Sequence, residues 1–350
     1  MFRKSSKGLL IPTVIALSTL TLISCGGSGD SEQTVKPVPV VAQPTGEVTP
    51  PATEHHETDG VKTQTTSQVT VASNTFTTLE RNFSSETVVT DVMQVSSTVA
   101  KTHDIGKTLR YIGIQGDYLV GWEFNGAYDS KILSYSLVSN KILEEDNPDF
   151  NVSGLSFNGI IMSVDGAEDV NFYHMDKGVM GHHFFQIKDF TGTASKFLST
   201  AYLDHNYAYV FNTDEVIRVH LKDTSKPEKV TDIPNFDKVT FTSDEKFLYI
   251  GDYDGVNDAS VLILDKKNST LANTLNLPGI SVNSITVDAN YIYISDNISK
   301  NVLIYNKHTL ADSGSITVNA KTYIDYANGM LYIYRDDTQV VEEHTLSFAP

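Results

Sequence analysis

Oxygen-bearing side chains gather in one short segment, Asp252-Tyr253-Asp254-Gly255-Val256-Asn257-Asp258. Carboxylates and amides at alternate positions, with a glycine to turn the chain, are typical of Ca²⁺ loops. The segment departs from the EF-hand pattern, because its glycine comes early and no bidentate glutamate follows. Asp252, Asp254, Asn257 and Asp258 therefore predict either a local Ca²⁺ site or a tight turn in which they bond their own backbone.

A second segment gathers imidazoles and thioethers, which are ligands that copper accepts. Its members are His174, Met175, Met180, His182 and His183. A hairpin in a divergent repeat would bring the same side chains together without any metal. The segment therefore predicts either a copper site or a hairpin that binds no metal.

One acidic or amide side chain recurs after each of six apolar runs. These residues are Glu123, Asp165, Asn212, Asp252, Asp296 and Asp336. If the loops that carry them share one face of a ring-shaped fold, they form a ring of oxygen ligands for a cation or a cationic ligand. The alternative is turn chemistry, since Asp and Asn readily start turns.

The elements that must position these residues repeat along the chain from about residue 108. Each unit has a short strand, a tight turn rich in Gly, Asn or Asp, a second strand, a polar loop and a third strand. A weaker fourth strand follows in most units. The second strands align on Leu119, Ile161, Tyr209, Tyr249, Tyr293 and Tyr332, at intervals of 42, 48, 40, 44 and 39 residues.

Four antiparallel strands in about 42 residues predict the blade of a β-propeller, because one such sheet cannot bury both faces alone. We expect an all-β fold with six blades over residues 108–350 of a body spanning 67–350. The last unit ends near Phe348 after its third strand, so its fourth strand must come from elsewhere. Residues 67–107 contain the strand-like runs QVTVA, TFTTLE and ETVVTDVMQV, one of which we expect to close the ring. A seventh blade is the alternative if this region builds a whole sheet.

The units are similar to the degenerate propeller repeats of the YVTN, NHL and LVIVD types. Asp223-Thr224-Ser225-Lys226-Pro227 resembles the Asp-x-Ser-x-Pro turn of LVIVD-type repeats. Quinoprotein-like propellers carry a tryptophan in every blade, whereas this chain has a single one, Trp122. That subgroup is therefore disfavoured.

The N-terminus reads as an export signal: MFRKSSK is basic, and residues 8–24 are mostly apolar. Leu22-Ile23-Ser24-Cys25 resembles the lipobox of bacterial lipoprotein precursors. The resemblance implies cleavage before Cys25 and acylation there by palmitate-like chains that hold the protein to a membrane. The residue after Cys25 is Gly26 and not Asp, which resembles the Gram-negative lipoproteins that are sorted to the outer membrane rather than retained in the inner membrane. An uncleaved membrane anchor is the alternative.

Residues 25–66 carry the lipidated cysteine and a polar, proline-rich stretch without hydrophobic periodicity, which predicts a disordered tether. The chain has a formal net charge of −17, and removal of residues 1–25 leaves 23 basic against 43 acidic residues. Such a body repels phosphate backbones, so nucleic acid is disfavoured as a partner. Cys25 is the only cysteine, which excludes an intrachain disulfide.

The chain contains no Gly-x-Ser-x-Gly elbow, phosphate-binding glycine loop or His-Glu-x-x-His motif. Anchor, tether and propeller together predict a lipid-anchored module of the bacterial envelope that holds a protein or ligand without catalysis. The first alternative is a metal-dependent envelope hydrolase or lactonase with ligands scattered around the propeller axis. The second is a copper-handling envelope protein. Ca²⁺ is the one cofactor candidate, and an envelope protein is the expected partner.

Overall fold

The computed structural model describes one unit of the chain, within Glu54–Pro350. Its backbone is described over residues 63–71, 74–82, 93–124, 130–146, 152–155, 160–165, 169–176, 179–187, 201–203, 207–212, 215–232, 238–253 and 258–349. Side chains are described over 93–123, 131–143, 207–210, 215–223, 226–232, 240–251 and 259–349. Cys25, the expected signal peptide and most of the expected tether lie outside these ranges.

The described strands form six four-stranded antiparallel sheets, here called blades 1 to 6 in chain order, and one separate hairpin. The hairpin pairs β1 (Thr63–Val71) with β2 (Asn74–Asn82). Blade 1 contains β4 (Leu109–Gln115), β5 (Tyr118–Phe124), β6 (Ser130–Ser136) and β7 (Lys141–Asp146). Blade 2 contains β8 (Val152–Leu155), β9 (Ile160–Asp165), β10 (Asp169–Asp176) and β11 (Val179–Ile187). Blade 3 contains β12 (Ala201–Leu203), β13 (Tyr207–Asn212), β14 (Glu215–His220) and β15 (Asp223–Asp232).

The remaining blades follow the same order of strands. Blade 4 contains β16 (Lys238–Ser243), β17 (Phe247–Tyr253), β18 (Asp258–Asp265) and β19 (Thr270–Pro278). Blade 5 contains β20 (Val282–Val287), β21 (Tyr291–Asp296), β22 (Asn301–Asn306) and β23 (Asp312–Thr317). Blade 6 contains β24 (Thr322–Ala327), β25 (Met330–Arg335), β26 (Val340–Ala349) and β3 (Gln94–Asp104).

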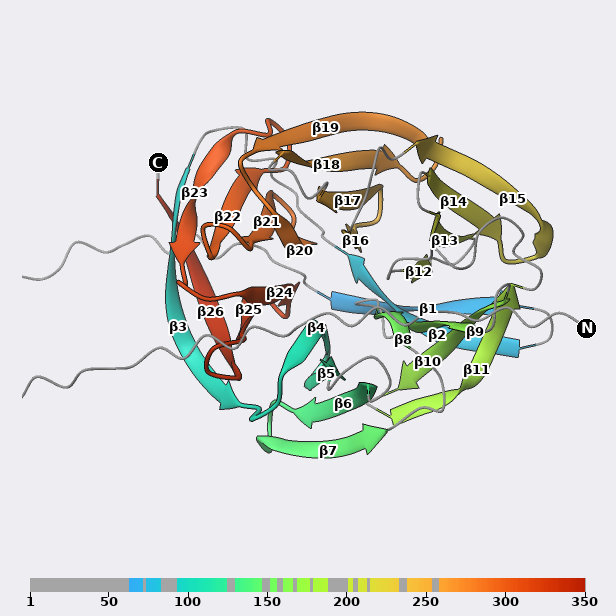
Figure 1. Cartoon of the computed structure of the whole chain (residues 1–350), viewed down its shortest axis with the longest axis horizontal. Coiled ribbons are helices and arrows are strands. Elements are labelled where there is room, and N and C mark those ends of the chain that lie inside the picture. Colours follow the sequence, from blue (N-terminus) through green and yellow to red (C-terminus); the bar gives the residue numbers. More distant parts are fainter. Residues whose placement is uncertain are drawn as a thin grey trace, which may run out of the picture. The chain divides into compact units, whose positions relative to one another are not determined.

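The blades stand around a common axis, with the first strand of each at the centre and the last at the rim (Figure 1). Consecutive first strands contact one another from β12 through β16, β20 and β24 to β4, and β4 contacts β8. Contact between β12 and β9 completes the circuit. The propeller predicted from the repeat is thereby confirmed.

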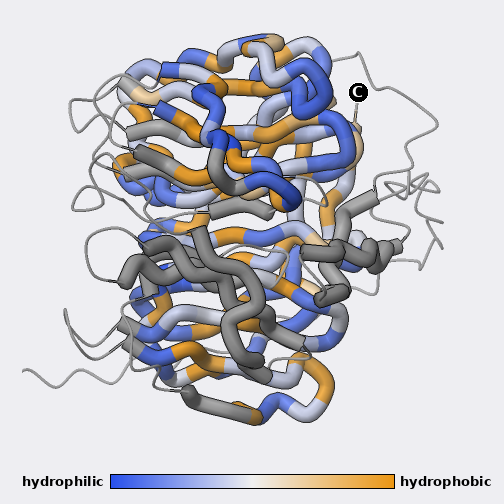
Figure 2. The backbone as a smooth tube through the Cα atoms, turned by 90° about the vertical axis from the view of Figure 1, so that its right-hand side faces the viewer, coloured by the Kyte–Doolittle hydropathy of each residue, from blue (hydrophilic) through white to orange (hydrophobic). Residues whose placement is uncertain are grey.

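Burial changes from the axis to the rim. Every residue of β20, β21 and β24 is buried, because neighbouring blades cover both faces of these strands. The rim strand β23 instead alternates between exposed and buried positions. Figure 2 shows hydrophobic residues throughout the coloured strands. The one-sided pattern at the rim and the two-sided pattern at the axis explain why the sequence shows only partial alternation.

Adjacent blades pack closely at Gly251 of β17. A Cβ atom on Gly251 of β17 would lie 2.8 Å from Val282 Cγ1 of the next blade and 2.9 Å from Thr240 Cγ2. A core of buried side chains continues from β17 through blade 5 into blade 6. Gly251 therefore sets the approach of blades 4 and 5.

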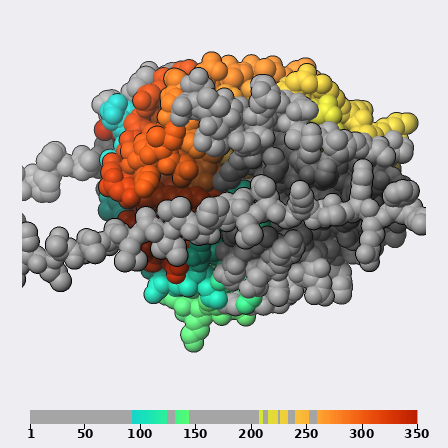
Figure 3. All heavy atoms as spheres, viewed as in Figure 1, coloured from blue at the N-terminus to red at the C-terminus, as the bar shows by residue number. Residues whose placement is uncertain are grey.

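The ring is closed by a strand from the N-terminal part of the body. β3 pairs antiparallel with β26 from Val340↔Asp104 to Ala349↔Gln94, and it is the rim strand of blade 6. Figure 3 shows β3, in cyan, at the surface beside the orange and red residues of the last blades. Only the last two residues of ETVVTDVMQV belong to this strand, while QVTVA and TFTTLE fall largely in β1 and β2, which pair with each other. The closing strand is therefore displaced toward the C-terminus from the runs singled out in the sequence.

Side-chain hydrogen bonds tie β3 to its neighbour β26 and to the first blade. His103 Nε2 lies 2.6 Å from Glu343 Oε1 of β26, and His103 Nδ1 lies 2.7 Å from Asn140 Oδ1 in the β6–β7 turn. Lys101 Nζ donates to the carbonyl of Leu137 at 2.8 Å. One strand thus links the last blade to the first.

Turns between the first and second strands of blades 4 and 5 share one design. Asp244 accepts hydrogen bonds from the amides of Lys246 and Phe247 and from the hydroxyl of Tyr249. Asp288 accepts the equivalent hydrogen bonds from the amides of Asn290 and Tyr291 and from the hydroxyl of Tyr293. A carboxylate at the start of the turn thereby satisfies amides that no strand pairs.

The segment that resembles an LVIVD turn lies in a strand and not in a turn. Asp223 begins β15, and the turn itself lies at residues 221–222. Pro227 lies where the register between β14 and β15 shifts. β15 is a rim strand and has no neighbouring strand on its outer side. The missing amide of Pro227 therefore removes no strand-pairing hydrogen bond there.

Candidate functional site

The structure contains a cavity at the propeller axis, lined by the first strands of four blades. It is small and partly open to solvent, and the space in it that a water molecule can occupy is about 30 Å³. The lining residues are Tyr111 and Ile112 of β4, Thr240, Phe241 and Thr242 of β16, Ser284 and Ile285 of β20, and Tyr323, Ile324 and Asp325 of β24. We call it the axial cavity.

Hydroxyl groups on one first strand bond the backbone of the next. Ser284 Oγ accepts the amide of Ile324 at 2.9 Å, and Thr286 Oγ1 accepts the amide of Tyr326 at 3.0 Å. A first strand has a paired neighbour in its own sheet on one side only, so its other edge needs partners from elsewhere. These bonds hold β20 and β24 in register along the axis.

Asp325 carries the negative charge of the axial cavity. Asp325 is only 3% exposed, and its Oδ2 accepts a hydrogen bond from the amide of Ile114 in blade 1 at 2.7 Å. Oδ1 accepts the hydroxyl of Thr286 in blade 5 at 3.3 Å. The carboxylate is therefore held between two blades by hydrogen bonds from the Ile114 amide and the Thr286 hydroxyl.

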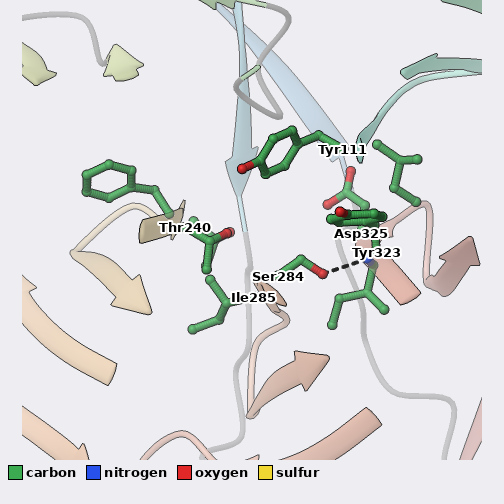
Figure 4. Close-up of a pocket in the computed structure, with 10 residues that line it drawn as sticks. Tyr111, Thr240, Ser284, Ile285, Tyr323 and Asp325 are labelled. Carbon is green, nitrogen blue, oxygen red and sulfur yellow. Dashed lines mark hydrogen bonds between the residues drawn. The ribbon is translucent and has the colours of Figure 1, made fainter. Parts of the chain in front are cut away.

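Two aromatic rings form the wall beside Asp325. The ring centroids of Tyr111 and Tyr323 are 5.6 Å apart, and their planes are inclined by 48°. Tyr111 also stacks on Trp122, with the ring centroids 5.7 Å apart. Burial raises the pKa of Tyr323 to about 12, so its phenol stays protonated at neutral pH. Figure 4 shows the Asp325 carboxylate beside both rings, with Thr240 across the cavity.

One hydroxyl in the lining is buried and unsatisfied. Thr242 is 1% exposed, and its Oγ1 has no hydrogen-bond partner among the residues that the structure describes. An unsatisfied buried hydroxyl costs roughly 1–3 kcal/mol. A guest that donates a hydrogen bond to Thr242 would recover part of that free energy.

Three members of the predicted oxygen ring, Glu123, Asp296 and Asp336, have described side chains. Glu123 lies 3.6 Å from Lys107 Nζ. Asp296 Oδ1 accepts the amides of Ser281 and Ile298 at 2.9 and 3.0 Å. The amide of Asp336 donates to the carbonyl of Lys321 at 3.0 Å. None of the three lines the axial cavity.

Asp296 shows the turn chemistry that was the alternative for the ring. Burial pushes its pKa upward, but hydrogen bonds from Ser299 and from the amides of Ser281 and Ile298 bring the pKa below its ordinary value. The carboxylate is thus held ionised by its own turn.

The other predicted site residues have side chains outside the described set. They are Asp165, Asn212, Asp252, Asp254, Asn257, Asp258, His174, Met175, Met180, His182 and His183. The backbone of the histidine and methionine segment is a hairpin, in which Met175 pairs with Met180 and Tyr173 with His183. Across the described side chains, no group of three or more His, Cys, Asp or Glu is placed to hold a metal ion.

Asp325 was missed by the sequence analysis, although a signal was present. It lies in the strand TYIDYA, in which every residue is buried. A lone carboxylate inside an apolar first strand has to face either the axis or a polar partner.

Comparisons with known proteins add little beyond the fold. No family model matches the chain, and no curated protein matches it. Among solved structures, it resembles the β-propeller domain of Cps50 (Swd1) from Myceliophteria thermophila, with 11% identity, a TM-score of 0.43 and coverage of 71% of this chain and 99% of that one. It also resembles BamB from Moraxella catarrhalis, with 11% identity, a TM-score of 0.41 and coverage of 71% and 100%. Similarity this distant supports no function, and the fold rests on the strand pairings above.

In the part of the chain that the structure describes, no helix has the length and hydrophobicity needed to cross a bilayer.

Proposed function

We propose that this protein is a non-catalytic binding module of the bacterial envelope, anchored through lipid on Cys25, which holds a protein partner at its propeller axis. The observation that supports the proposal is the axial cavity. Two of its polar groups, the Ser284 hydroxyl and the Asp325 carboxylate, are fixed by backbone amides of neighbouring blades, so part of the cavity is preorganised for binding. The acidic body would steer a basic partner toward it.

The anchor follows from the lipobox-like sequence before Cys25 and the polar segment after it. A tether of about 40 residues would let the propeller search for a partner at a distance from the membrane. Gly26 favours the outer membrane as the destination.

The test is chemical crosslinking in cells that express the full-length protein, followed by affinity purification and quantitative mass spectrometry. A Cys25→Ala variant is the matched control, and incorporation of an alkyne-tagged palmitate reports on the anchor. We expect label on the wild type alone, and one or two envelope proteins enriched with the anchored form. Failure of both forms to enrich any protein would contradict the binding module.

The copper alternative depends on residues of β10 and β11 whose side chains lie outside the described set, and nothing in the structure tests the hydrolase alternative. They remain predictions from the sequence. Analysis of bound metal in the purified protein would detect copper or calcium directly.

A further inference from the structure

Exposed aliphatic side chains gather where the closing strand β3 meets blade 1. Six large hydrophobic residues are exposed among the described side chains, and four of them belong to this region. They are Val99 of β3 and Val138, Ile142 and Leu143 of the β6–β7 hairpin. Single exposed aliphatic residues are common on soluble proteins, whereas a group of them marks a contact surface.

Hydrogen bonds place the two parts of this group side by side. Lys101 Nζ donates to the carbonyl of Leu137 in the β6–β7 turn at 2.8 Å. His103 Nδ1 lies 2.7 Å from Asn140 Oδ1 in the same turn. The end of β3 accordingly lies beside the start of β7 in Figure 1. Lys101 and Lys141 are exposed here, and we call these two lysines and the four aliphatic residues the rim patch.

The β6–β7 turn holds Val138 at an exposed tip. The amide of Leu137 donates to the carbonyl of Asp117 at 2.9 Å. The amide of Asn140 donates to the carbonyl of Ser136, also at 2.9 Å. Val138 is nonetheless 70% exposed. An aliphatic side chain that its own turn holds in water gains hydrophobic free energy when a partner covers it.

A β-bulge makes this edge of blade 1 a poor site for another strand. β7 is the rim strand, and no strand of the described chain pairs with its outer side. The register between β6 and β7 shifts between Ser134↔Glu144 and Tyr135↔Ile142, which leaves Leu143 as an extra residue. Bulges are one means by which proteins prevent pairing between sheet edges. The rim patch therefore fits a surface that needs no matching backbone, such as a lipid bilayer.

Lys101 and Lys141 suit the same surface. Lysines beside aliphatic residues are typical of bilayer interfaces, because their ammonium groups reach lipid phosphates while alkyl groups meet the acyl chains. They also partly offset the acids of their own strands, Asp104 on β3 and residues 144–146 on β7. The net charge of −17 opposes adhesion of the whole protein to anionic lipid, but charges more than about 8 Å apart are largely screened at physiological ionic strength.

The chain that leads from the predicted anchor enters the propeller at this rim. β3 begins at Gln94 and is the first strand of the six blades after Cys25. It carries Val99 and Lys101 of the rim patch. A lipid on Cys25 would therefore connect the membrane to the propeller through this strand. Because an anchored protein stays at the membrane, its docking is intramolecular, and a weak contact is enough.

We infer that the rim patch docks the propeller against the surface of the phospholipid bilayer to which Cys25 is anchored. The inference rests on the proposed function, since it requires the lipid anchor, and it adds the orientation of the propeller on the membrane. The docking surface lies on the rim strands and their turn. It does not include the first strands, which line the axial cavity.

The experiment measures whether residue 138 enters a lipid interface. An environment-sensitive fluorophore is attached to Val138→Cys in the acylated lipoprotein, in which Cys25 is blocked and the new thiol is the only reactive one. The matched control is Ile298→Cys, because Ile298 is also exposed but lies in the β21–β22 turn of blade 5. Both proteins are reconstituted into protein-free vesicles of phosphatidylethanolamine with a minor share of phosphatidylglycerol. We expect the emission at residue 138 to move to shorter wavelength and to be reduced by quenchers embedded in the lipid, with neither change at residue 298.

Matched substitutions then identify the side chains that dock. Leu143→Ser should lower the ratio of docked to undocked protein by about tenfold. Leu271→Ser, at an equally exposed leucine of the rim strand β19 in blade 4, should leave the ratio unchanged. Lys141→Glu should also lower the ratio by about tenfold at low salt, because it brings a negative charge to an anionic surface. Lys267→Glu, in the β18–β19 turn, is its control. All four residues are exposed, so the variants should fold.

The outcomes separate this inference from the proposed function. A shift confined to residue 138, and lost with Leu143→Ser, supports the inference. No shift in a protein whose Cys25 is acylated overturns the inference and leaves the anchored module standing. A shift that grows with protein concentration in detergent assigns the rim patch to a second copy of the chain, and a shift seen only in native membranes assigns it to a partner protein; either result overturns the inference. A reactive Cys25 thiol in the wild-type protein overturns the anchor, and the inference with it.

Discussion

Lys307 Nζ lies 3.0 Å from Asp244 Oδ2, and the two residues come from adjacent blades. Both side chains are buried, with 8% and 2% of their surface exposed. The same ammonium donates to the carbonyl of Asp288 at 2.8 Å. A single lysine after β22 therefore binds the turns of blades 4 and 5 together.

Replacing this lysine should destabilise the propeller. Lys307→Met leaves the Asp244 carboxylate buried without its counter-ion, and we expect a loss of roughly 3–5 kcal/mol in the free energy of unfolding. Urea denaturation measures the loss. The exposed Lys267→Met is the control and should change stability by less than about 0.5 kcal/mol. If Lys307→Met is as mild as its control, the ion pair has no structural role.

The two equivalent aspartates should respond to pH in opposite directions. Burial raises the pKa of Asp244, but the Lys307 ammonium and hydrogen bonds from Phe247 and Tyr249 reverse this and bring it below its ordinary value. For Asp288, burial outweighs its hydrogen bonds and raises the pKa. Lys307 contacts the Asp244 carboxylate directly but reaches Asp288 only through a backbone carbonyl.

A carboxyl with a lowered folded-state pKa stabilises the fold above its unfolded-state pKa of about 3.9, and this contribution fades as pH falls through the folded-state value. The stability advantage of wild type over Asp244→Asn should therefore shrink as pH falls below about 4. A raised folded-state pKa has the opposite effect on the pH dependence of stability. Relative to Asp288→Asn, wild type should therefore lose stability as pH rises from about 4. Denaturation of all three proteins across this range is the measurement. Parallel pH profiles for the two variants would contradict the assignment.

The approach of blades 4 and 5 at Gly251 predicts a steric effect. Gly251→Ala places a methyl group 2.8 Å from Val282 Cγ1, and we expect a loss of about 1–3 kcal/mol through overpacking. Adding Val282→Ala removes that contact and should leave Gly251→Ala less harmful than it is in the wild-type background. Thermal unfolding of the four proteins in this double-mutant cycle gives the coupling. Additive losses from the two substitutions would show that the added methyl group is accommodated by movements other than that of Val282.

Ring closure predicts a sharp boundary for N-terminal truncation. A variant that begins at residue 93 keeps β3, and its melting temperature should lie within a few degrees of that of the full chain. A variant that begins at residue 107 lacks β3 and exposes the edge of β26, so we expect a decrease of more than about 10 °C, with self-association through the open edge. Equal stability of the two truncations would mean that β3 is dispensable for closure.

The fold was largely predictable because its signals are local. Tight turns such as Asp288-Ala289-Asn290 need residues that accept turn geometry, and apolar runs of about six residues between them cannot be helices of ordinary length. Their recurrence then predicted the blades. The missing fourth strand after Phe348 predicted that a distant segment must complete the last blade.

The position of that segment was less predictable. β3 contains Ser96, Ser97, Thr98 and Lys101, and its burial pattern is mostly exposed. A rim strand has only one covered face and so carries a weak hydrophobic pattern. Its identity depends on pairing with β26, which lies more than 200 residues away along the chain.

The candidate site, like the fold, was predictable from the sequence only in part. The sequence by itself determined the strands, their turns, the number of repeats and the surplus of acid, because each depends on residue types and short spacings. Only the tertiary structure decided that Asp325, Thr242, Tyr111 and Tyr323 meet at one cavity, since they come from three blades separated by long stretches of chain. Closing the ring brings these strands to a common axis, and no local pattern records which side chains will face it.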